Sequence, residues 1–154
     1  MGKLFVIEGT DGSGKQTQLQ KLAERLKDNN IKYQTVSFPN YDSPSSSLVK
    51  MYLSGEFGTD PKDVSPYVAS TFYAVDRFAT YKKDFEKFYQ DGGIVLADRY
   101  TTGNMVHQAG KISDLKEREK FLDWLFAGLV PNRACTPPRF LSRWSLKSLV
   151  FFFV

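Results

Sequence analysis

The stretch that most constrains the fold covers residues 9–17 and reads GTDGSGKQT. An apolar run, LFVI at residues 4–7, precedes it, and a helical pattern follows it. Its glycines let the backbone turn sharply and direct several N–H groups into one concavity. The spacing G-x-x-x-x-G-K, from Gly9 to Lys15, is that of a P-loop, in which a helix N-terminus and the lysine attract phosphate oxygens. Because the strand before it and the helix after it are the context that this motif requires, we predict a nucleotide phosphate site rather than a chance glycine-rich turn.

One position departs from that motif. Gln16 replaces the serine or threonine whose hydroxyl ordinarily ligates Mg²⁺, and Thr17 lies one position late. Either the Thr17 hydroxyl or the Gln16 amide oxygen therefore has to serve as the metal ligand. The sequence leaves both alternatives open.

The net charge of +4 does not indicate a nucleic-acid-binding protein. Residues 1–123 hold 17 basic and 17 acidic side chains, so the whole excess lies in residues 124–154. A chain of 154 residues with 42% hydrophobic and 25% charged residues is typical of one soluble globular domain. A basic face for nucleic acid is therefore not expected.

Features of secreted and membrane proteins are not apparent in the sequence. The N-terminus has no secretory pattern, and no apolar run approaches the length of a membrane span. The single cysteine, Cys135, excludes an internal disulfide framework and is compatible with a reducing compartment. We expect a cytoplasmic protein without a membrane partner.

Strand and helix patterns alternate along the chain, which predicts an α/β fold with a central parallel sheet. Apolar positions 19, 22, 23 and 26 indicate an amphipathic helix that ends near Asn29-Asn30. Residues 31–38 and 94–97 are predicted strands. Ser43-Pro44 and Ser65-Pro66 are helix starts with proline at the first position, and Ser113 is the expected cap of a later helix.

Three polar clusters follow predicted strands. Residues 9–17 follow the first strand, Phe38-Pro39 the second and Asp98-Arg99 the third. Ligands of parallel α/β sheets bind outside the carboxyl ends of the strands, so we expect these clusters to converge. There Asp98 can hold Mg²⁺ directly or through water, and Arg99 can clamp a second phosphate.

The helix predicted from Pro66 carries Tyr73 and Arg77, which are four residues apart and so share a face. An aromatic ring and a planar guanidinium on one face can stack on a nucleobase and bond its edge. A buried ring beside a surface arginine would have the same spacing. The two interpretations are equally supported by spacing alone.

Taken together in this order, the motifs resemble the thymidylate kinase family. The resemblance rests on FVIEGTDGSGK at residues 5–15, Phe38-Pro39, YLSGEFG at residues 52–58, Tyr73-x3-Arg77 and DRY at residues 98–100 followed by Asn104, and it covers about residues 3–126. It implies a P-loop NTPase fold, a three-layer sandwich with a central parallel sheet. It also implies transfer of the γ-phosphoryl group of ATP to dTMP, with Mg²⁺ as cofactor and a homodimer as a possible assembly through helices near residues 44–53 and 66–81.

The resemblance also implies roles for individual residues. Lys15, Arg99 and Asp11 would be catalytic, with Arg99 the clamp on the acceptor phosphate, and Thr17 and Asp98 would hold the metal. The ATP phosphates would be bound by the loop residues Gly9, Thr10, Asp11, Gly12, Ser13, Gly14, Lys15, Gln16 and Thr17. The substrate dTMP would be bound by Asp11, Phe38, Pro39, Tyr73, Arg77, Arg99, Asn104 and His107. Family members commonly have a serine at the place of Gly103 and a tyrosine or phenylalanine at the place of His107, so base and sugar preference are left open.

The resemblance ends near residue 126, and we therefore divide the chain into a kinase core at 1–126 and a divergent tail at 127–154 that is not a separate domain. The tail has no acidic residue and ends in LVFFFV at residues 149–154. It lacks the arginine-bearing lid on which family members with glycine at the place of Gly12 depend, although Arg139 and Arg143 are spaced to mimic one. We favour a truncation or reading-frame change that leaves the fold incomplete at its C-terminus; the alternative is a genuine tail whose last run adds a strand to the sheet. A nucleotide-binding fragment with little turnover, or a P-loop kinase for another nucleoside or nucleotide, are the alternative functions.

Overall fold

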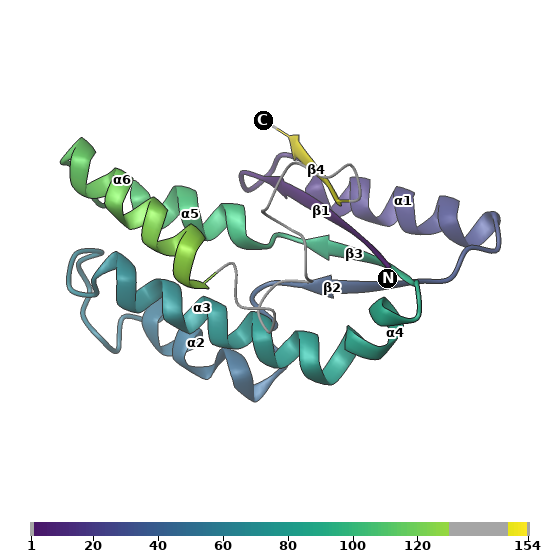
Figure 1. Ribbon diagram of the computed structural model, residues 1–154, viewed down its shortest axis with the longest axis horizontal. Coiled ribbons are helices and arrows are strands. Elements are labelled where there is room, and N and C mark those ends of the chain that lie inside the picture. The colour runs from purple at the N-terminus through teal and green to yellow at the C-terminus, as the bar shows by residue number, and fades with distance from the viewer. Residues whose placement is uncertain (1, 130–147, 154) are drawn as a thin grey trace.

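The computed structural model describes residues 2–129 and 148–153. Within these residues, parallel strands form one sheet in the order β2-β3-β1-β4 (Figure 1). The strands are β1 (Lys3–Gly9), β2 (Tyr33–Ser37), β3 (Ile94–Asp98) and β4 (Ser148–Phe153). The predicted α/β class and the parallel arrangement are confirmed.

Helices connect the strands and cover the sheet on both faces. The α-helices are α1 (Lys15–Asp28), α2 (Ser47–Leu53), α3 (Pro66–Thr80), α4 (Glu86–Gln90), α5 (Thr101–Ala109) and α6 (Leu115–Trp124). A 3₁₀ turn (Pro44–Ser46) precedes α2, and π-helical turns follow α3 (Tyr81–Phe85) and α6 (Leu125–Leu129). In Figure 1, α1 lies on one side of the sheet, and α3 and α4 lie on the other.

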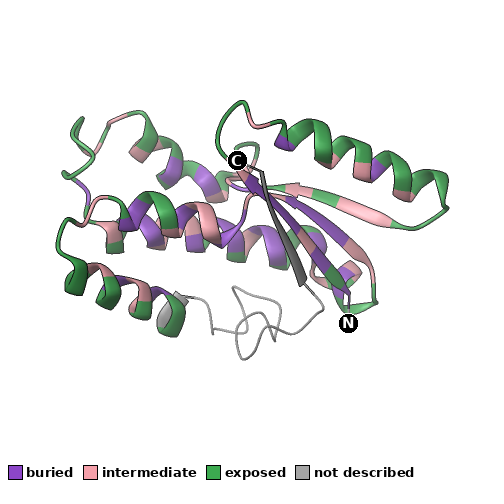
Figure 2. Ribbon diagram, turned by 90° about the horizontal axis from the view of Figure 1, so that it is seen from above, coloured by how far each residue is buried: buried purple, intermediate pink, exposed green. Residues whose placement is uncertain are grey.

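The central strands are buried because both of their faces are covered (Figure 2). Leu4 and Val6 of β1 project to one face, where they pack with Tyr81, Phe85 and Tyr89 of the segment after α3. Each such side chain contributes about 1.5–3 kcal/mol when it is fully removed from water. Continuous apolar runs at 4–7 and 94–97 are therefore what a doubly covered parallel sheet requires.

The helix starts predicted from Ser-Pro pairs are confirmed. Ser65 Oγ accepts a hydrogen bond from the Val68 backbone N–H at 3.3 Å, and Ser43 Oγ accepts one from Ser45 N–H at 3.3 Å. The cap predicted at Ser113 is wrong. Asp114 caps α6 instead, accepting from Glu117 N–H at 2.9 Å, because its carboxylate reaches an N–H group of the first turn and adds a favourable negative charge there.

The second strand is shorter than predicted. Asn30 adopts the left-handed conformation with φ 56°, and Ile31 N–H donates to the Leu26 carbonyl at 2.9 Å. These features close helix α1, so residues 29–31 belong to its C-terminal cap. Pairing with β3 consequently begins at Tyr33.

The last run of the chain forms β4, which pairs with β1 in parallel from Leu4↔Ser148 to Gly9↔Phe153. A strand added to the sheet by the last run is what the alternative of a genuine tail predicts. Whether residues 127–154 arise from a reading-frame change, and whether the core ends at 126, stay predictions. Cys135, Arg139 and Arg143 lie outside the described residues. Among the residues described, no helix is both long and apolar enough to cross a membrane.

Candidate functional site

The loop between β1 and α1 surrounds a cavity of about 380 Å³, here called the phosphate-loop cavity. Gly12 and Gly14 have φ values of 80° and 83°, a conformation that side chains with a Cβ rarely adopt. The cavity is lined by Asp11, Gly12, Gly14, Lys15, Gln16, Thr17, Asp98 and Arg99. The convergence predicted from strand ends therefore occurs at β1 and β3.

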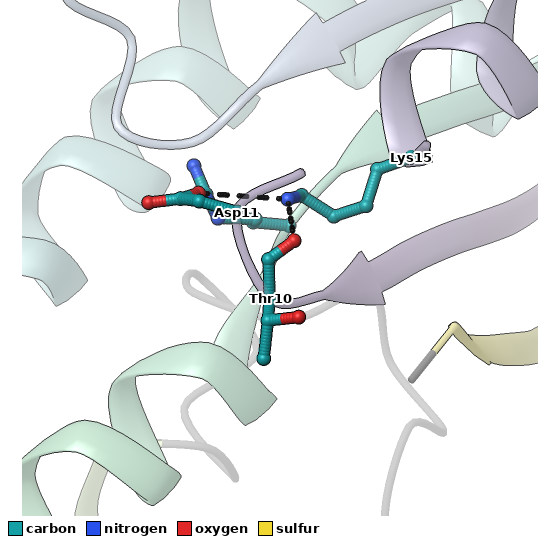
Figure 3. Close-up of polar contacts among 4 residues, drawn as sticks. Thr10, Asp11 and Lys15 are labelled. Carbon is teal, nitrogen blue, oxygen red and sulfur yellow. Dashed lines mark hydrogen bonds and ion pairs between the residues drawn. The ribbon is translucent and has the colours of Figure 1, made fainter. Parts of the chain in front are cut away.

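Lys15 is held over this loop. Its side chain is buried, and Nζ donates to the Thr10 carbonyl at 2.7 Å and lies 3.6 Å from Asp11 Oδ1 (Figure 3). The remaining predicted loop residues, Gly9, Thr10 and Ser13, shape the turn without lining the cavity. Ser13 Oγ is buried and has no hydrogen-bond partner among the described residues. A lysine ammonium fixed beside a glycine-rich turn is a ready counter-charge for phosphate.

Asp11 also forms an ion pair with Arg99, which arrives from the end of β3. The Arg99 guanidinium, and to a lesser extent Lys15, lower the pKa of the exposed Asp11 carboxyl below its usual value. Asp11 therefore keeps its negative charge to lower pH than an isolated aspartate. In this arrangement Asp11 orients Arg99 toward the loop, and it lines the phosphate-loop cavity rather than the larger cavity described next.

Asp98 has the features of a metal ligand. Its Oδ1 atom is buried without a hydrogen-bond partner among the described residues, and it lines the same cavity as Gln16 and Thr17. Carboxylate, hydroxyl and amide oxygens are the donors that Mg²⁺ prefers. The residues present therefore fit a magnesium ion. Thr17 and Gln16, the two alternatives for the remaining protein ligand, both line the cavity.

A larger cavity of about 520 Å³ adjoins the end of the sheet. It is lined by all but one of the residues predicted to bind the substrate: Phe38, Pro39, Tyr73, Arg77, Arg99, Asn104 and His107. Arg99 lines both cavities. His107 is exposed at this surface, whereas Asn104 is buried. The tertiary fold thus brings together residues from α3, from α5 and from the segment just after β2, which lie far apart in the sequence.

Arg77 is not a surface arginine, which removes one of the two interpretations of the Tyr73–Arg77 pair. It is 2% exposed, and its guanidinium carbon lies 5.9 Å from the centroid of the Tyr100 ring. That ring packs edge-on against Phe38, with centroids 5.2 Å apart. Tyr73, Arg77 and this aromatic pair form one wall of the larger cavity.

Gln108 and Lys111 are among the residues of the larger cavity that were not singled out from the sequence. Gln108 is 3% exposed, and its Oε1 atom, like Asn104 Oδ1, is buried without a hydrogen-bond partner among the described residues. Lys111 donates to the Tyr52 hydroxyl at the same cavity. Gln108 follows Asn104 by four residues, so the helical spacing of α5 was the signal that could have found it.

Burial raises the pKa of the Tyr73 hydroxyl to about 12, with a smaller contribution from Tyr52. A folded-state pKa above the unfolded value of 10.0 means that the folded protein holds this proton more tightly. Tyr73 therefore stabilises the fold below pH 10, and that contribution is lost as the pH rises toward 12.

The expected result is that Tyr73→Phe leaves the tyrosinate absorbance titration unchanged up to about pH 11, because Tyr73 ionises only above that range. The matched control is Tyr33→Phe on β2, at a position that does not line the larger cavity. If the absorbance difference between wild type and Tyr73→Phe develops near pH 10, the raised pKa of Tyr73 is contradicted.

The family model described as thymidylate kinase matches residues 7–121 of this chain. Among curated proteins, the chain is 30% identical over 132 residues to the thymidylate kinase of an Exiguobacterium species, an alignment covering 85% of this chain and 60% of that protein. It is 31% identical over 114 residues to a probable thymidylate kinase of Pyrococcus horikoshii, covering 74% of this chain and 55% of that protein. The chain thus spans little more than half the length of the curated relatives it matches.

A solved structure of thymidylate kinase from Candida albicans is similar in fold. The TM-score is 0.70 at 21% sequence identity, and the alignment covers 99% of this chain and 63% of that one. At this identity the likeness concerns the fold, which is the predicted P-loop α/β sandwich.

Proposed function

This chain belongs to the thymidylate kinase family, and from that premise we propose that it transfers the γ-phosphoryl group of ATP to dTMP, giving dTDP. The observation that carries the proposal is the position of Arg99. It lines both the phosphate-loop cavity and the larger cavity. A phosphate-binding arginine at this boundary lies where the phosphates of two nucleotides would meet.

In the proposed reaction the protein mainly positions the substrates and compensates charge, because phosphoryl transfer requires little covalent chemistry from protein side chains. Lys15 and the loop amides bind the outer phosphates of ATP. Arg99, oriented by Asp11, binds the dTMP phosphate and holds it in line with the γ-phosphorus. The buried position of Lys15 strengthens its interaction with phosphate, because water screens it less.

The larger cavity suits a thymine base. The edge of thymine presents one N–H group between two carbonyl oxygens. Asn104 Oδ1 and Gln108 Oε1 are buried acceptors at the cavity, either of which can receive that N–H. Arg77 is the donor for a carbonyl oxygen, and Tyr73 offers its ring to the face of the base. Phe38 and Pro39 close the pocket.

We assign Mg²⁺ to Asp98 and Thr17, with Gln16 as the alternative to Thr17. When bound, the ion neutralises charge on the ATP phosphates. Replacing Asp98 with asparagine keeps the shape of the side chain but removes its charge. We expect the Mg²⁺ concentration that gives half-maximal thermal stabilisation by ATP to rise roughly tenfold. Asp28→Asn, at the exposed end of α1, is the control and should leave this concentration unchanged.

A nucleotide-binding fragment with little turnover is the second candidate. Among the described residues, the cations that line the phosphate-loop cavity are Lys15 and Arg99. A further arginine that neutralises the transition state is worth roughly 10³–10⁵ in rate. The candidates for it, Arg139 and Arg143, lie outside the described residues.

One coupled experiment tests these functions. ADP formation from ATP is measured with dTMP, dUMP and dCMP, together with thermal stabilisation by each nucleotide. We expect both turnover and stabilisation to be greatest with dTMP. Stabilisation by dTMP without ADP formation would support the binding fragment, and turnover preferring another acceptor would overturn the thymidylate assignment.

We further propose that the chain pairs as a homodimer through α2 and α3. Helix α3 exposes Val68, Val75 and Phe78, and α2 exposes Leu48 and Leu53. Apolar side chains of this size gathered on neighbouring helices are typical of interfaces. Sedimentation equilibrium of the whole chain measures the assembly directly.

A further inference from the structure

We propose that Glu8 is a positioning residue that fixes the backbone of Arg99 and thereby aims its guanidinium at the acceptor phosphate. The inference rests on the proposed function, which assigns the acceptor phosphate to Arg99. Glu8 stands on β1 directly before the phosphate-binding loop, and it is 4% exposed. Carboxylates are almost never this buried unless they are paired, so its contacts require an explanation.

Among the described residues, the hydrogen bonds of Glu8 go to the junction between β3 and α5. Its Oε1 atom accepts hydrogen bonds from Tyr100 N–H at 2.8 Å, Thr102 Oγ1 at 2.9 Å and Gly103 N–H at 3.2 Å. Tyr100 is the N-cap of α5 and has no side-chain cap of its own. A carboxylate from the neighbouring strand therefore caps this helix, accepting from the N–H groups of Tyr100 and Gly103 and placing a negative charge at its positive end.

Two hydrogen bonds to consecutive residues of β1 flank Arg99, one to a backbone carbonyl and one to a side-chain carboxylate. Its own N–H donates to the Ile7 carbonyl at 3.0 Å, and the next N–H in the chain, that of Tyr100, donates to Glu8. Between them Arg99 adopts φ 62°, the left-handed region that residues other than glycine avoid. Such a conformation persists only where the surrounding structure stabilises it, and here the hydrogen bonds to Ile7 and Glu8 do so.

The contact is also closely fitted on the side of the helix. A Cβ atom at Gly103 would lie 3.3 Å from Glu8 Oε2, tighter than ordinary van der Waals contact. Farther along α5, Asn104 is fixed separately, because its Nδ2 donates to Ser70 Oγ at 3.1 Å. Glu8 therefore governs the first turn of α5 and Arg99, while the base-facing part of the helix has its own anchor.

This division predicts a selective defect. Glu8→Ala removes all three bonds, so Arg99 relaxes from its left-handed conformation and no longer faces the phosphate. We expect the affinity for dTMP to fall at least about tenfold, while the affinity for thymidine, which lacks the phosphate, changes less than about twofold. Glu8→Gln keeps a carbonyl acceptor of the same reach and should restore part of the dTMP affinity.

The experiment is isothermal titration of the whole chain with dTMP and with thymidine, on wild type and each variant. Thr102→Val provides a second test should Glu8→Ala not fold, because it removes one hydrogen-bond donor to Glu8 from a half-buried position. It should lower the affinity for dTMP by less than Glu8→Ala does and should likewise spare the affinity for thymidine. Glu24→Ala, an exposed acid of α1, is the control and should change neither affinity.

An equal loss for both ligands would make Glu8 merely structural and overturn the inference, as would unchanged dTMP affinity in Glu8→Ala and Thr102→Val. If wild type binds no dTMP, the proposed function itself fails. That result is read from the wild-type titration and so is distinct from a failure confined to the variants.

Discussion

Lys15→Ala is expected to weaken the binding of ATP about a hundredfold and to lower any phosphoryl-transfer rate by roughly 10²–10³. Lys15 Nζ is held in a buried position over the loop by the Thr10 carbonyl and lies near the Asp11 carboxylate. Removing it deletes a positive charge that faces the cavity where the outer phosphates would bind. Because the cavity screens charges less than bulk water does, the loss is larger than for a surface lysine.

The measurement is thermal stabilisation by ATP with Mg²⁺, followed by ADP formation with dTMP. Lys21→Ala is a matched control, since Lys21 stands on the exposed side of the same helix. Stabilisation by dTMP should survive Lys15→Ala, because the larger cavity does not include Lys15. Undiminished stabilisation by ATP would refute the assignment of the phosphate loop.

Arg77→Ala is expected to weaken dTMP binding by roughly ten- to a hundredfold and to leave ATP binding nearly unchanged. Arg77 lines the larger cavity but not the phosphate-loop cavity. It is 2% exposed and packs over the Tyr100 ring, so its guanidinium is fixed before a nucleotide arrives. A preorganised donor loses little conformational entropy on binding, which makes its deletion costly.

The same change also opens space in the core, so the free energy of unfolding should fall by about 2–4 kcal/mol. Arg77→Lys separates this packing effect from recognition, because lysine keeps the charge and much of the stem but lacks the planar fork of donors. Arg25→Ala, on an exposed turn of α1, is the surface control. Equal losses of ATP and dTMP affinity in Arg77→Ala would show that our division of the site into two cavities is wrong.

The two cavities meet at one residue, which gives the proposed reaction its geometry. Arg99 pairs with Asp11 in the loop and also lines the larger cavity. A phosphate bound there would lie next to the phosphates that we propose Lys15 to bind. Arg99 in turn lowers the pKa of the Asp11 carboxyl. The ion pair between them therefore persists through neutral pH and is lost only as the pH falls below the ordinary range of an aspartate.

Local signals in the sequence were sufficient for the phosphate loop and for most element boundaries. Glycine spacing determines where left-handed backbone is possible, and Gly12 and Gly14 adopt it. The Ser-Pro pairs start helices because hydroxyl caps and proline act within one turn. The wrong cap at Ser113 shows the limit of such signals, because two adjacent residues could both cap and only the local backbone selected Asp114.

Contacts between distant residues required the tertiary structure. Spacing placed Tyr73 and Arg77 on one helical face but gave no indication of whether that face was buried. Packing against Tyr100, which lies between β3 and α5, decided it. Gln108 carries no motif of its own, and its acceptor atom matters only because α5 turns it toward the larger cavity.

By itself, then, the sequence determined the backbone conformation of the loop from residue 9 to 17, the parallel α/β class and the residues able to meet at the strand ends. These depend on contacts within a few residues and on the period of the apolar pattern. Only the tertiary structure decided that Arg99 stands between two cavities, and that Glu8, 92 residues from Tyr100, holds it there. A bond between side chain and backbone across that separation leaves no periodic trace in the sequence, since it exists only once β1 and β3 lie side by side.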